Sequence, residues 1–217
     1  MDNTISDIYT RQQDLLQKDF KDESVLVIGL GGIGSWVALN LALLGVGTLV
    51  LIDPDTIEAS NLNRTLFKLS DIGRKKTEAI KYLISERRQD TIILTIDDYF
   101  SPDMLDKYSV DYIFDCTDNL NTRDKLKDLN FQGNYVKCGY DGYSATISIN
   151  DFESGSWGEG GSYTTVPSFF GTPQVISALV ITEMLINVQI ETRTINFEID
   201  KVLGEISGKG ITENAEN

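Results

Sequence analysis

The stretch that decides the fold is Ser24-Val25-Leu26-Val27-Ile28-Gly29-Leu30-Gly31-Gly32-Ile33-Gly34. Its first half is an apolar, β-branched run of the kind found in buried parallel strands. Its second half matches the pattern G-x-G-x-x-G, and apolar residues at helical spacing follow it up to Gly45. The sequence therefore predicts a strand, a tight glycine turn and a helix, which is the context that a nucleotide-binding loop requires.

Four glycines of this turn are candidates for contact with a nucleotide: Gly29, Gly31, Gly32 and Gly34. Glycine lets the backbone approach a phosphate or ribose closely, and the helix N-terminus offers free N–H groups. Asp53 ends the next apolar run, where a carboxylate can accept hydrogen bonds from ribose hydroxyls. The alternative is a tight turn that binds nothing. The loop and its acid favour a nucleotide but do not identify it.

Apolar runs and helical patterns alternate along the rest of the chain. Strands are expected at 48–52, 91–96, 111–115, 135–138 and 143–149, and helices at 75–87, 120–130 and 175–185. Such alternation indicates βαβ units and a mostly parallel sheet. We expect an α/β fold: a Rossmann-like, doubly wound, mainly parallel sheet with added antiparallel strands at the C-terminal side.

A single domain is expected over residues 1–206. Its other parts are expected to be an N-terminal helix within 1–20 (amphipathic over 3–18), a crossover loop at 151–167, two short closing strands within 193–206 and, beyond the domain, a flexible tail at 207–217. Apolar stretches are too short for a transmembrane helix, and the first 20 residues lack the apolar core of a signal peptide.

Charge and composition exclude several classes of function. Thirty-three acidic residues against 19 basic ones give a net charge of −14, which disfavours binding to nucleic acids. The chain has no histidine, which removes Ser-His and Cys-His catalysis and the commonest zinc ligand. The two cysteines, Cys116 and Cys138, cannot form a disulfide framework, so we expect a reduced, cytoplasmic setting.

A second group of residues bears on the chemistry. It comprises Asp53-Pro54-Asp55, Asn61-Leu62-Asn63-Arg64, Lys76, and Asp115-Cys116-Thr117-Asp118-Asn119 with Arg123 after it. Ligands of doubly wound sheets bind at the carboxyl ends of the strands, so Arg64, Lys76 and Asp118 are expected to surround one crevice. Two cations and a carboxylate beside a nucleotide loop suit a triphosphate with Mg²⁺ better than a nicotinamide.

These motifs, in this order and spacing, resemble one family. The chain is similar to the ThiF/MoeB/HesA-type adenylyltransferases, which act on the sulfur carriers of thiamine and molybdopterin synthesis, and to the adenylation domains that activate ubiquitin-like proteins. The resemblance extends from Arg11-Gln12 through the glycine turn, Asp53, Asn61–Arg64, Lys76 and Asp115–Asn119 to the helix at 173–188, nearly the whole chain.

The resemblance implies an activity and a site. The chain would use ATP to convert a C-terminal carboxylate into an acyl-adenylate, releasing pyrophosphate. Asp53 would hold the ribose, Asn61, Arg64 and Lys76 the phosphates, and Asp118 the Mg²⁺, with Asn119 a further candidate for nucleotide contact. Arg11 would reach into the site of a partner protomer, so a homodimer is expected.

Each role has a simpler rival. Arg64, Lys76 and Arg11 could be solvated cations, and Asn61 an ordinary turn residue. Asp55 could contact the nucleotide or only cap the following turn. Arg123 is expected in a salt bridge, although a place at the edge of the site is possible.

Three departures from the family pattern qualify the resemblance. Many members bind zinc through two Cys-x-x-Cys pairs, which are missing here, so no zinc is expected. Residues 151–167 contain no cysteine, so we expect adenylation without a thioester on this chain, with Cys116 and Cys138 as packing residues. Thr65 replaces the glutamine of the usual Asn-Leu-x-Arg-Gln, which puts one contact in doubt.

Several substrates stay open. The leading expectation is a small ubiquitin-like or sulfur-carrier protein ending in Gly-Gly, whose tail the loop at 151–167 could clamp with Trp157 and Tyr163. A peptide of the antibiotic type is an alternative, and a tRNA-borne carboxylate is disfavoured by the acidic charge. The remote alternatives are an NAD-dependent oxidoreductase, which would leave Asn61–Arg64 and Asp118 unexplained, and a non-catalytic partner subunit.

Overall fold

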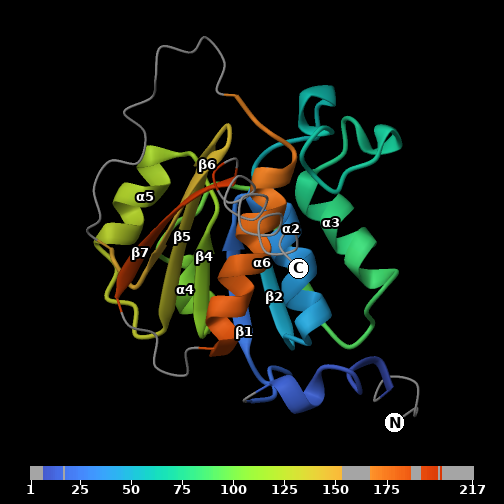
Figure 1. The fold of residues 1–217 in the computed structure, drawn as a ribbon, viewed down its shortest axis with the longest axis vertical. Coiled ribbons are helices and arrows are strands. Elements are labelled where there is room, and N and C mark those ends of the chain that lie inside the picture. Colours follow the sequence, from blue (N-terminus) through green and yellow to red (C-terminus); the bar gives the residue numbers. More distant parts are fainter. Residues whose placement is uncertain (1–6, 17, 153–166, 187–191, 200, 202–217) are drawn as a thin grey trace, which may run out of the picture.

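The computed structural model describes residues 7–16, 18–152, 167–186, 192–199 and 201. These residues form seven strands in the order β3-β2-β1-β4-β5-β6-β7 (Figure 1). The strands are β1 (Ser24–Ile28), β2 (Thr48–Ile52), β3 (Ile92–Ile96), β4 (Tyr112–Asp115), β5 (Asn134–Asp141), β6 (Ser144–Ile149) and β7 (Arg193–Glu198).

The strands from β3 to β5 run parallel, whereas β6 and β7 are added antiparallel. The predicted α/β fold, with a mainly parallel sheet and antiparallel strands at the C-terminal side, is confirmed. In the register of the sheet, Ile28 of β1 lies beside Ile52 of β2 and Asp115 of β4, so these strands end at one level. The strand order reverses between β1 and β4, which is where such sheets bind ligands.

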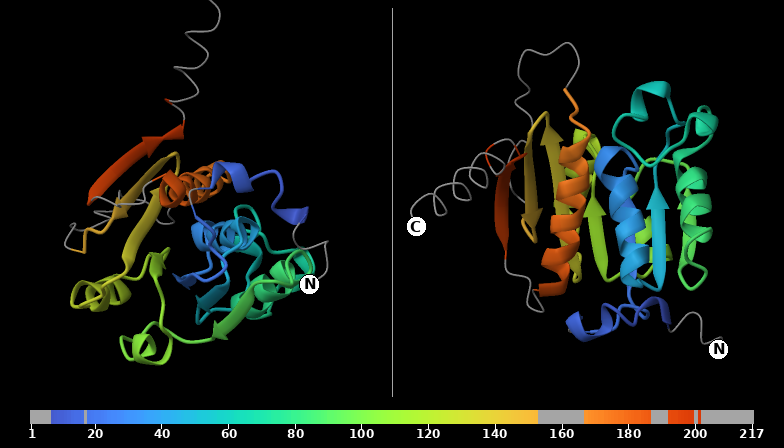
Figure 2. Two further views of the ribbon diagram at one scale, coloured as in Figure 1. Left: turned by 90° about the horizontal axis from the view of Figure 1, so that it is seen from below. Right: turned by 45° about the vertical axis from the view of Figure 1, so that its right-hand side comes forward.

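Helices cover both faces of the sheet (Figure 2). One face carries α2 (Gly32–Leu44), α3 (Lys76–Ser85) and α6 (Gly171–Ile186), and the other carries α4 (Met104–Lys107) and α5 (Leu120–Lys127). Three single-turn 3-10 helices are η1 (Gln13–Leu15), η2 (Ala59–Asn61) and η3 (Leu69–Asp71). The sequence predicts α2, α3, α5 and α6 but not the shorter helices, because one turn leaves no apolar period to detect.

The helix that follows the glycine turn, α2, is largely buried. Ten of the thirteen residues of α2 are buried, because it packs against the sheet and against both α3 and α6. Val37 and Leu41 of α2 belong to the larger core, together with Ile80 of α3 and Ile176 of α6. The N-terminus of α2 is therefore held in a fixed position beyond the C-terminal end of the central strand β1.

The expected amphipathic helix over 3–18 is wrong for the described residues. Only Asp7 and Ile8 are α-helical, and turns and η1 follow. Contacts with the main domain override the helical pattern: the Tyr9 hydroxyl donates to Asp90 at 2.5 Å, and the Gln12 side chain donates to the carbonyl of Leu44 at 3.0 Å. These bonds fasten the segment to the loop between α3 and β3 and to the C-terminal end of α2.

The C-terminal expectation is corrected as well. One strand, β7, takes the place of the first of two expected within 193–206, and Ile199 and Lys201 after it are helical. The second expected strand, the crossover loop over 153–166 and the tail at 207–217 lie outside the described residues. No helix in the described part of the chain is long and apolar enough to cross a membrane.

Candidate nucleotide site

The glycine turn between β1 and α2 needs glycine at two positions. Gly29 has a φ of +84°, a backbone angle that residues other than glycine rarely adopt. A Cβ on Gly34 would lie 1.8 Å from the carbonyl oxygen of Gly29, so the helix can start this close to the strand only without a side chain there. A Cβ on Gly31 would meet no atom within 4 Å, whereas a Cβ on Gly32 would lie 2.5 Å from the Tyr140 hydroxyl, so the turn is open at Gly31 and covered by Tyr140 at Gly32. No side chain caps α2, whose first amides therefore remain available to an anion.

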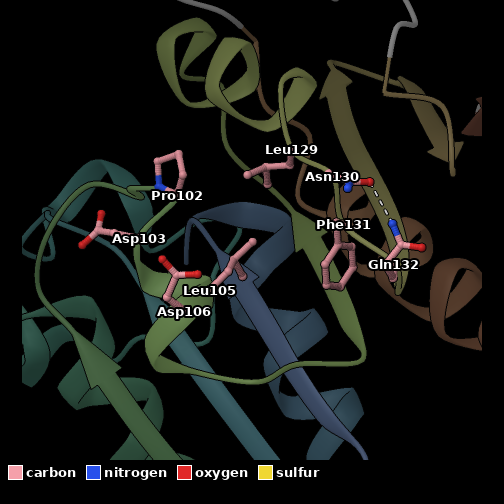
Figure 3. Close-up of a pocket in the computed structure, with 8 residues that line it drawn as sticks. All are labelled: Pro102, Asp103, Leu105, Asp106, Leu129, Asn130, Phe131 and Gln132. Atoms are coloured by element: carbon pink, nitrogen blue, oxygen red, sulfur yellow. Dashed lines mark hydrogen bonds between the residues drawn. The ribbon is translucent and has the colours of Figure 1, made fainter.

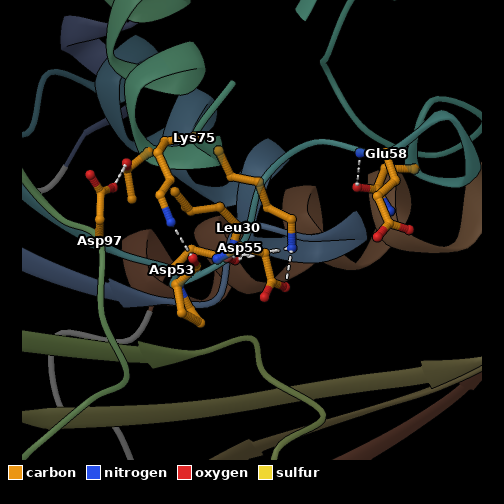
Figure 4. A network of polar contacts seen from close by, with 10 residues as sticks. Leu30, Asp53, Asp55, Glu58, Lys75 and Asp97 are labelled. Carbon is orange, nitrogen blue, oxygen red and sulfur yellow. Dashed lines mark hydrogen bonds and ion pairs between the residues drawn. The ribbon is translucent and has the colours of Figure 1, made fainter. Parts of the chain in front are cut away.

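Asp53, one residue beyond β2, is bound to this turn. Its side chain is buried, Oδ2 accepts the N–H of Leu30 at 2.6 Å, and Oδ1 accepts the N–H of Asp55 at 2.9 Å (Figure 4). The carboxylate thus fixes the glycine turn to the end of β2. A buried carboxylate at this strand end fits the role of a ribose acceptor that the sequence predicts.

Lys76 is the first residue of α3 and points back toward the same carboxylates. Its Nζ lies 2.7 Å from Oδ2 of Asp55 and 3.4 Å from Oδ1 of Asp53. The Lys76 side chain is 10% exposed, whereas that of Asp55 is 59% exposed. The structure therefore brings Lys76 to the glycine turn, with Asp55 as its closest anion. Among the described residues, the Asp55 side chain accepts a hydrogen bond from Lys76 and none from a backbone N–H, so it does not cap the following turn.

Asn61 and Arg64 lie in the turn that begins with η2. The Asn61 side chain accepts the N–H of Glu58 at 3.1 Å, and the hydroxyl of Thr65 donates to the Asn61 carbonyl at 2.8 Å. Nη1 of Arg64 donates to the carbonyl of Ser60 at 2.5 Å and to Oδ1 of Asn63 at 3.0 Å. Asn61 thus has a turn-forming role in this structure, and Thr65, at the position of the family's glutamine, closes the same turn.

Asp118 stands at the end of a tightly bonded loop after β4. Asp115, the last residue of β4, is fully buried, and its Oδ1 accepts both the N–H and the hydroxyl of Thr117 at 3.0 Å. Asn119 caps α5 by accepting the N–H of Thr122 at 3.0 Å. Between these anchors, Asp118 is exposed. Asn119, a predicted nucleotide contact, is engaged as a helix cap through its side-chain oxygen.

Arg123 of α5 contacts both this loop and the buried Asp115. It donates to the carbonyl of Thr117, and its Nε lies 3.7 Å from Oδ2 of Asp115. The hydroxyl of Tyr135 on β5 donates to the same Oδ2 at 3.2 Å. Burial raises the pKa of Asp115, and the Arg123 charge and these hydrogen bonds oppose that rise. The predicted salt bridge of Arg123 is confirmed.

Neither of the two free cysteines is fully exposed. Cys138 of β5 is fully buried. Cys116 follows β4, and a hydrogen bond with Cys138 and burial raise the pKa of its thiol well above the ordinary value. A thiol with a raised pKa is a poor nucleophile, which agrees with the expectation that both cysteines are packing residues.

Arg11 is exposed and lies far from the glycine turn of its own chain. Its neighbour Gln12 is bonded to Leu44 at the end of α2, whereas the turn lies at the start of that helix. Thirteen helical residues at about 1.5 Å each separate the two ends by about 20 Å. The structure therefore does not bring Arg11 to the residues around Asp53.

A hollow of about 410 Å³ lies elsewhere, between α4 and the turn that precedes β5 (Figure 3). Leu105, Leu129 and Phe131 contribute apolar surface to it, and Asp103 and Asp106 contribute carboxylates. The turn before β5 lies at the N-terminal ends of the parallel strands, whereas the glycine turn lies at their C-terminal ends. None of the predicted site residues lines this hollow.

Two contacts of this turn could not be predicted from the sequence. Nε1 of Trp36 in α2 donates to the Arg64 carbonyl at 3.0 Å, and Nδ2 of Asn63 donates to the carbonyl of Ser168 at 3.2 Å. Trp36 falls at an ordinary helical position of α2, and nothing in its spacing indicates a partner 28 residues away. An indole in an otherwise aliphatic helix start was the only available signal.

Comparisons with known proteins agree with this arrangement. A family model described as "ThiF family" matches residues 5–156. The tRNA threonylcarbamoyladenosine dehydratase of Haemophilus influenzae is 40% identical over 106 residues, which are 47% of this chain and 41% of that protein. The sulfur carrier protein ThiS adenylyltransferase of Escherichia coli is 40% identical over 114 residues, 51% of this chain and 45% of that protein. The matched stretch thus covers less than half the length of either relative.

Solved structures of E. coli MccB share the fold. One superposes with a TM-score of 0.72 at 20% identity and covers 92% of this chain and 71% of that chain. MccB with ATP gives a TM-score of 0.67 at 21% identity, covering 83% of this chain and 64% of that chain. MccB with MccA gives 0.68 at 22% identity, covering 88% and 68%.

Proposed function

The chain belongs to the ThiF family, and on that basis we propose that it is an ATP-dependent adenylyltransferase. It activates the C-terminal carboxylate of a small ubiquitin-like or sulfur-carrier protein as an acyl-adenylate and releases pyrophosphate. The observation that carries the proposal is the convergence of Lys76 and Asp53 on an open glycine turn at the switch point of the sheet. A relative that is 40% identical, the ThiS adenylyltransferase of E. coli, supports the substrate class.

These residues would contact different parts of the ATP molecule. Asp53 would accept from the ribose, and the first amides of α2 and the side chain of Lys76 would face the phosphates. Arg64 and Asn61 would complete the phosphate contacts from the neighbouring turn. The solved structure of MccB with ATP, a protein of the same fold, supports ATP as the nucleotide.

The exposed carboxylate of Asp118 fits a magnesium ion. Asp118 projects from a loop that is bonded on both sides, and no ion pair of Asp118 is found among the described residues. Carboxylate oxygens on a rigid loop suit Mg²⁺, which binds through one or two carboxylates and through substrate phosphates. When bound, the ion would neutralise charge on the phosphates of ATP.

The reaction places modest demands on the side chains. The attacking C-terminal carboxylate is already ionised at neutral pH, so no general base is required, and it displaces pyrophosphate from the α-phosphorus. Lys76 and Arg64 stabilise the negative charge that accumulates on the phosphates, while the turn fixes their position. A chain without histidine can carry out this chemistry.

A homodimer would complete the site. Arg11 lies about 20 Å from the glycine turn of its own chain, at the far end of α2. It can contribute to adenylation only if the dimer brings the N-terminal segment of one protomer to the site of the other. The family resemblance supports this supply of Arg11 between protomers.

A peptide is the second candidate for the substrate. The observation that favours it is the likeness to MccB, which has been solved with MccA and superposes over 88% of this chain. The H. influenzae dehydratase raises a tRNA-borne carboxylate as a third possibility, which the net charge of −14 opposes.

ATP–pyrophosphate exchange with Mg²⁺ tests the proposal. Purified carriers ending in Gly-Gly, a synthetic peptide set and bulk tRNA are supplied in turn, and the wild type is compared with Asp118→Ala. Asp124→Ala, which removes another exposed carboxylate, on α5, is the matched control. Exchange with a carrier that is lost only in Asp118→Ala supports the proposal. Exchange with the peptides or tRNA alone moves the substrate to that class, and ATP binding without any exchange contradicts the proposed activity.

A further inference from the structure

Arg64 is held by two kinds of contact, one to its side chain and one to its main chain. The guanidinium is bonded within its own turn, to Ser60 and Asn63. The main-chain carbonyl accepts from the indole N–H of Trp36 at 3.0 Å. The second contact is the one that reaches outside the turn, to a different element of the fold.

That element is the start of the helix that follows the glycine turn. Trp36 is the fifth residue of α2, directly after the first helical turn, which has no side-chain cap. Apolar contacts bring the two segments together, because Phe67 is buried and Leu62 and Leu66 pack against the same core as Val37. Apolar contacts of this kind are not directional. The hydrogen bond from Trp36 adds a directional contact between α2 and the turn that carries Arg64.

The residue type at position 36 matters for this contact. The indole is an apolar ring with a single N–H donor, so it can pack against the core and still bond a carbonyl. Phenylalanine would keep most of the packing and lose the donor. The carbonyl of Arg64 would then be left without this partner.

We infer that Trp36 is a positioning residue for the nucleotide site: its indole N–H sets Arg64 relative to the amides of α2, so that both meet the same phosphates. The inference rests on the proposed function, since it takes Arg64 and the glycine turn as parts of one ATP site. Trp36 acts through Arg64 and needs no contact with the nucleotide.

A double-mutant cycle with Trp36→Phe and Arg64→Ala tests the inference, with binding of ATP and Mg²⁺ measured by calorimetry on the full chain. Trp36→Phe is expected to weaken ATP binding about 2- to 10-fold, the net effect of one hydrogen bond. In the Arg64→Ala background the same substitution is expected to have no further effect, because the coupled group is gone. Leu43→Ala, an exposed position at the end of α2, is the control and leaves binding unchanged.

Fluorescence provides a second measurement for the case in which Arg64→Ala binds too weakly to titrate. The sequence contains two tryptophans, so Trp157→Phe leaves Trp36 as the single tryptophan, which excitation at the long-wavelength edge of the indole band selects over the tyrosines. ATP is expected to change its emission with the same midpoint as the calorimetric titration of that variant. Unchanged emission, or equal weakening by Trp36→Phe with and without Arg64, overturns the inference. Failure of the wild type to bind ATP instead overturns the proposed function itself.

Discussion

At the scale of single residues, the structure pairs the Lys76 cation with two carboxylates. Lys76 is nearly buried between Asp53 and Asp55, and the closer contact is to the more exposed of the two. A phosphate that approaches Lys76 must compete with the Asp55 carboxylate. Asp53 also accepts hydrogen bonds from the backbone of Leu30 and Asp55, so it has a structural role beside its proposed contact with the ribose.

Replacing Asp55 by Asn is expected to strengthen ATP binding. The substitution removes one negative charge beside the phosphates and frees Lys76 from its closest partner. Exposed ion pairs contribute about 0.2–1 kcal/mol, which corresponds to a decrease in the Kd for ATP of about 1.5- to 5-fold. Calorimetry with Mg²⁺ present measures this change, and Asp124→Asn is the control for net charge. Weaker binding by Asp55→Asn would show that Asp55 contacts the nucleotide or holds Lys76 in its working position.

At the scale of elements, much of the sheet could be predicted because its strands are short apolar runs with glycine or acid at their ends. The run at 24–29 becomes β1, and that at 48–52 becomes β2, with Asp53 directly after it. The N-terminal helix could not be predicted correctly, since Tyr9 and Gln12 take partners that are remote in sequence.

The candidate site shows the same division between local and remote information. The glycine turn, Asp53 and the first turn of α3 follow from local patterns. The capping role of Asn119 was available in principle, because asparagine before a helix favours that role. The bond from Trp36 to Arg64 and the salt bridge of Lys76 with Asp55 depend on how separate elements pack, so no local pattern contains them.

The turn between β1 and α2 offers a matched pair of glycine substitutions. Gly34→Ala is expected to lower the free energy of unfolding by about 1–3 kcal/mol or more, because its Cβ would overlap the Gly29 carbonyl. Gly31→Ala enters open space at a φ of −77° and is expected to cost at most about 1 kcal/mol. Urea denaturation of the two variants measures the difference. Equal stabilities would contradict the close strand-to-helix approach.

The buried carboxyl group of Asp115, at the end of β4, is expected to make the stability of the fold depend on pH. Burial raises the pKa of Asp115 in the folded state, so the folded state binds its proton more tightly than the unfolded state does. The contribution of this group to stability is therefore fully present below its unfolded pKa of about 4 and is lost as pH rises through the folded value. Asp115→Asn does not titrate. The difference in unfolding free energy is expected to move in favour of the variant as pH rises above about 4, and a constant difference from pH 4 to 8 would contradict the raised pKa.

At the scale of the whole molecule, one protomer contains the glycine turn and Asp118 at one edge and Arg11 at the other. Mixing Arg11→Ala with Asp118→Ala chains therefore tests the proposed dimer. Each chain alone is expected to be inactive, whereas a random mixture regains about a quarter of wild-type exchange activity, because half of the dimers contain one intact site. No recovery, in a mixture whose chains demonstrably exchange, would show that Arg11 is not supplied by the partner.

The order of the strands in the sheet also has a consequence for the newly made chain. β1 lies between β2 and β4, so the crevice beside the glycine turn has only one wall until β4 is made. A nascent chain on the ribosome can present Lys76 and Asp53 for several seconds, at about 5–20 residues per second, before Asp118 is synthesised. During that interval its central strand has one open edge. The proposed nucleotide site is therefore incomplete until β4 and Asp118 have been made, and a chain that ends before β4 lacks both the neighbour of β1 on that side and the proposed magnesium ligand.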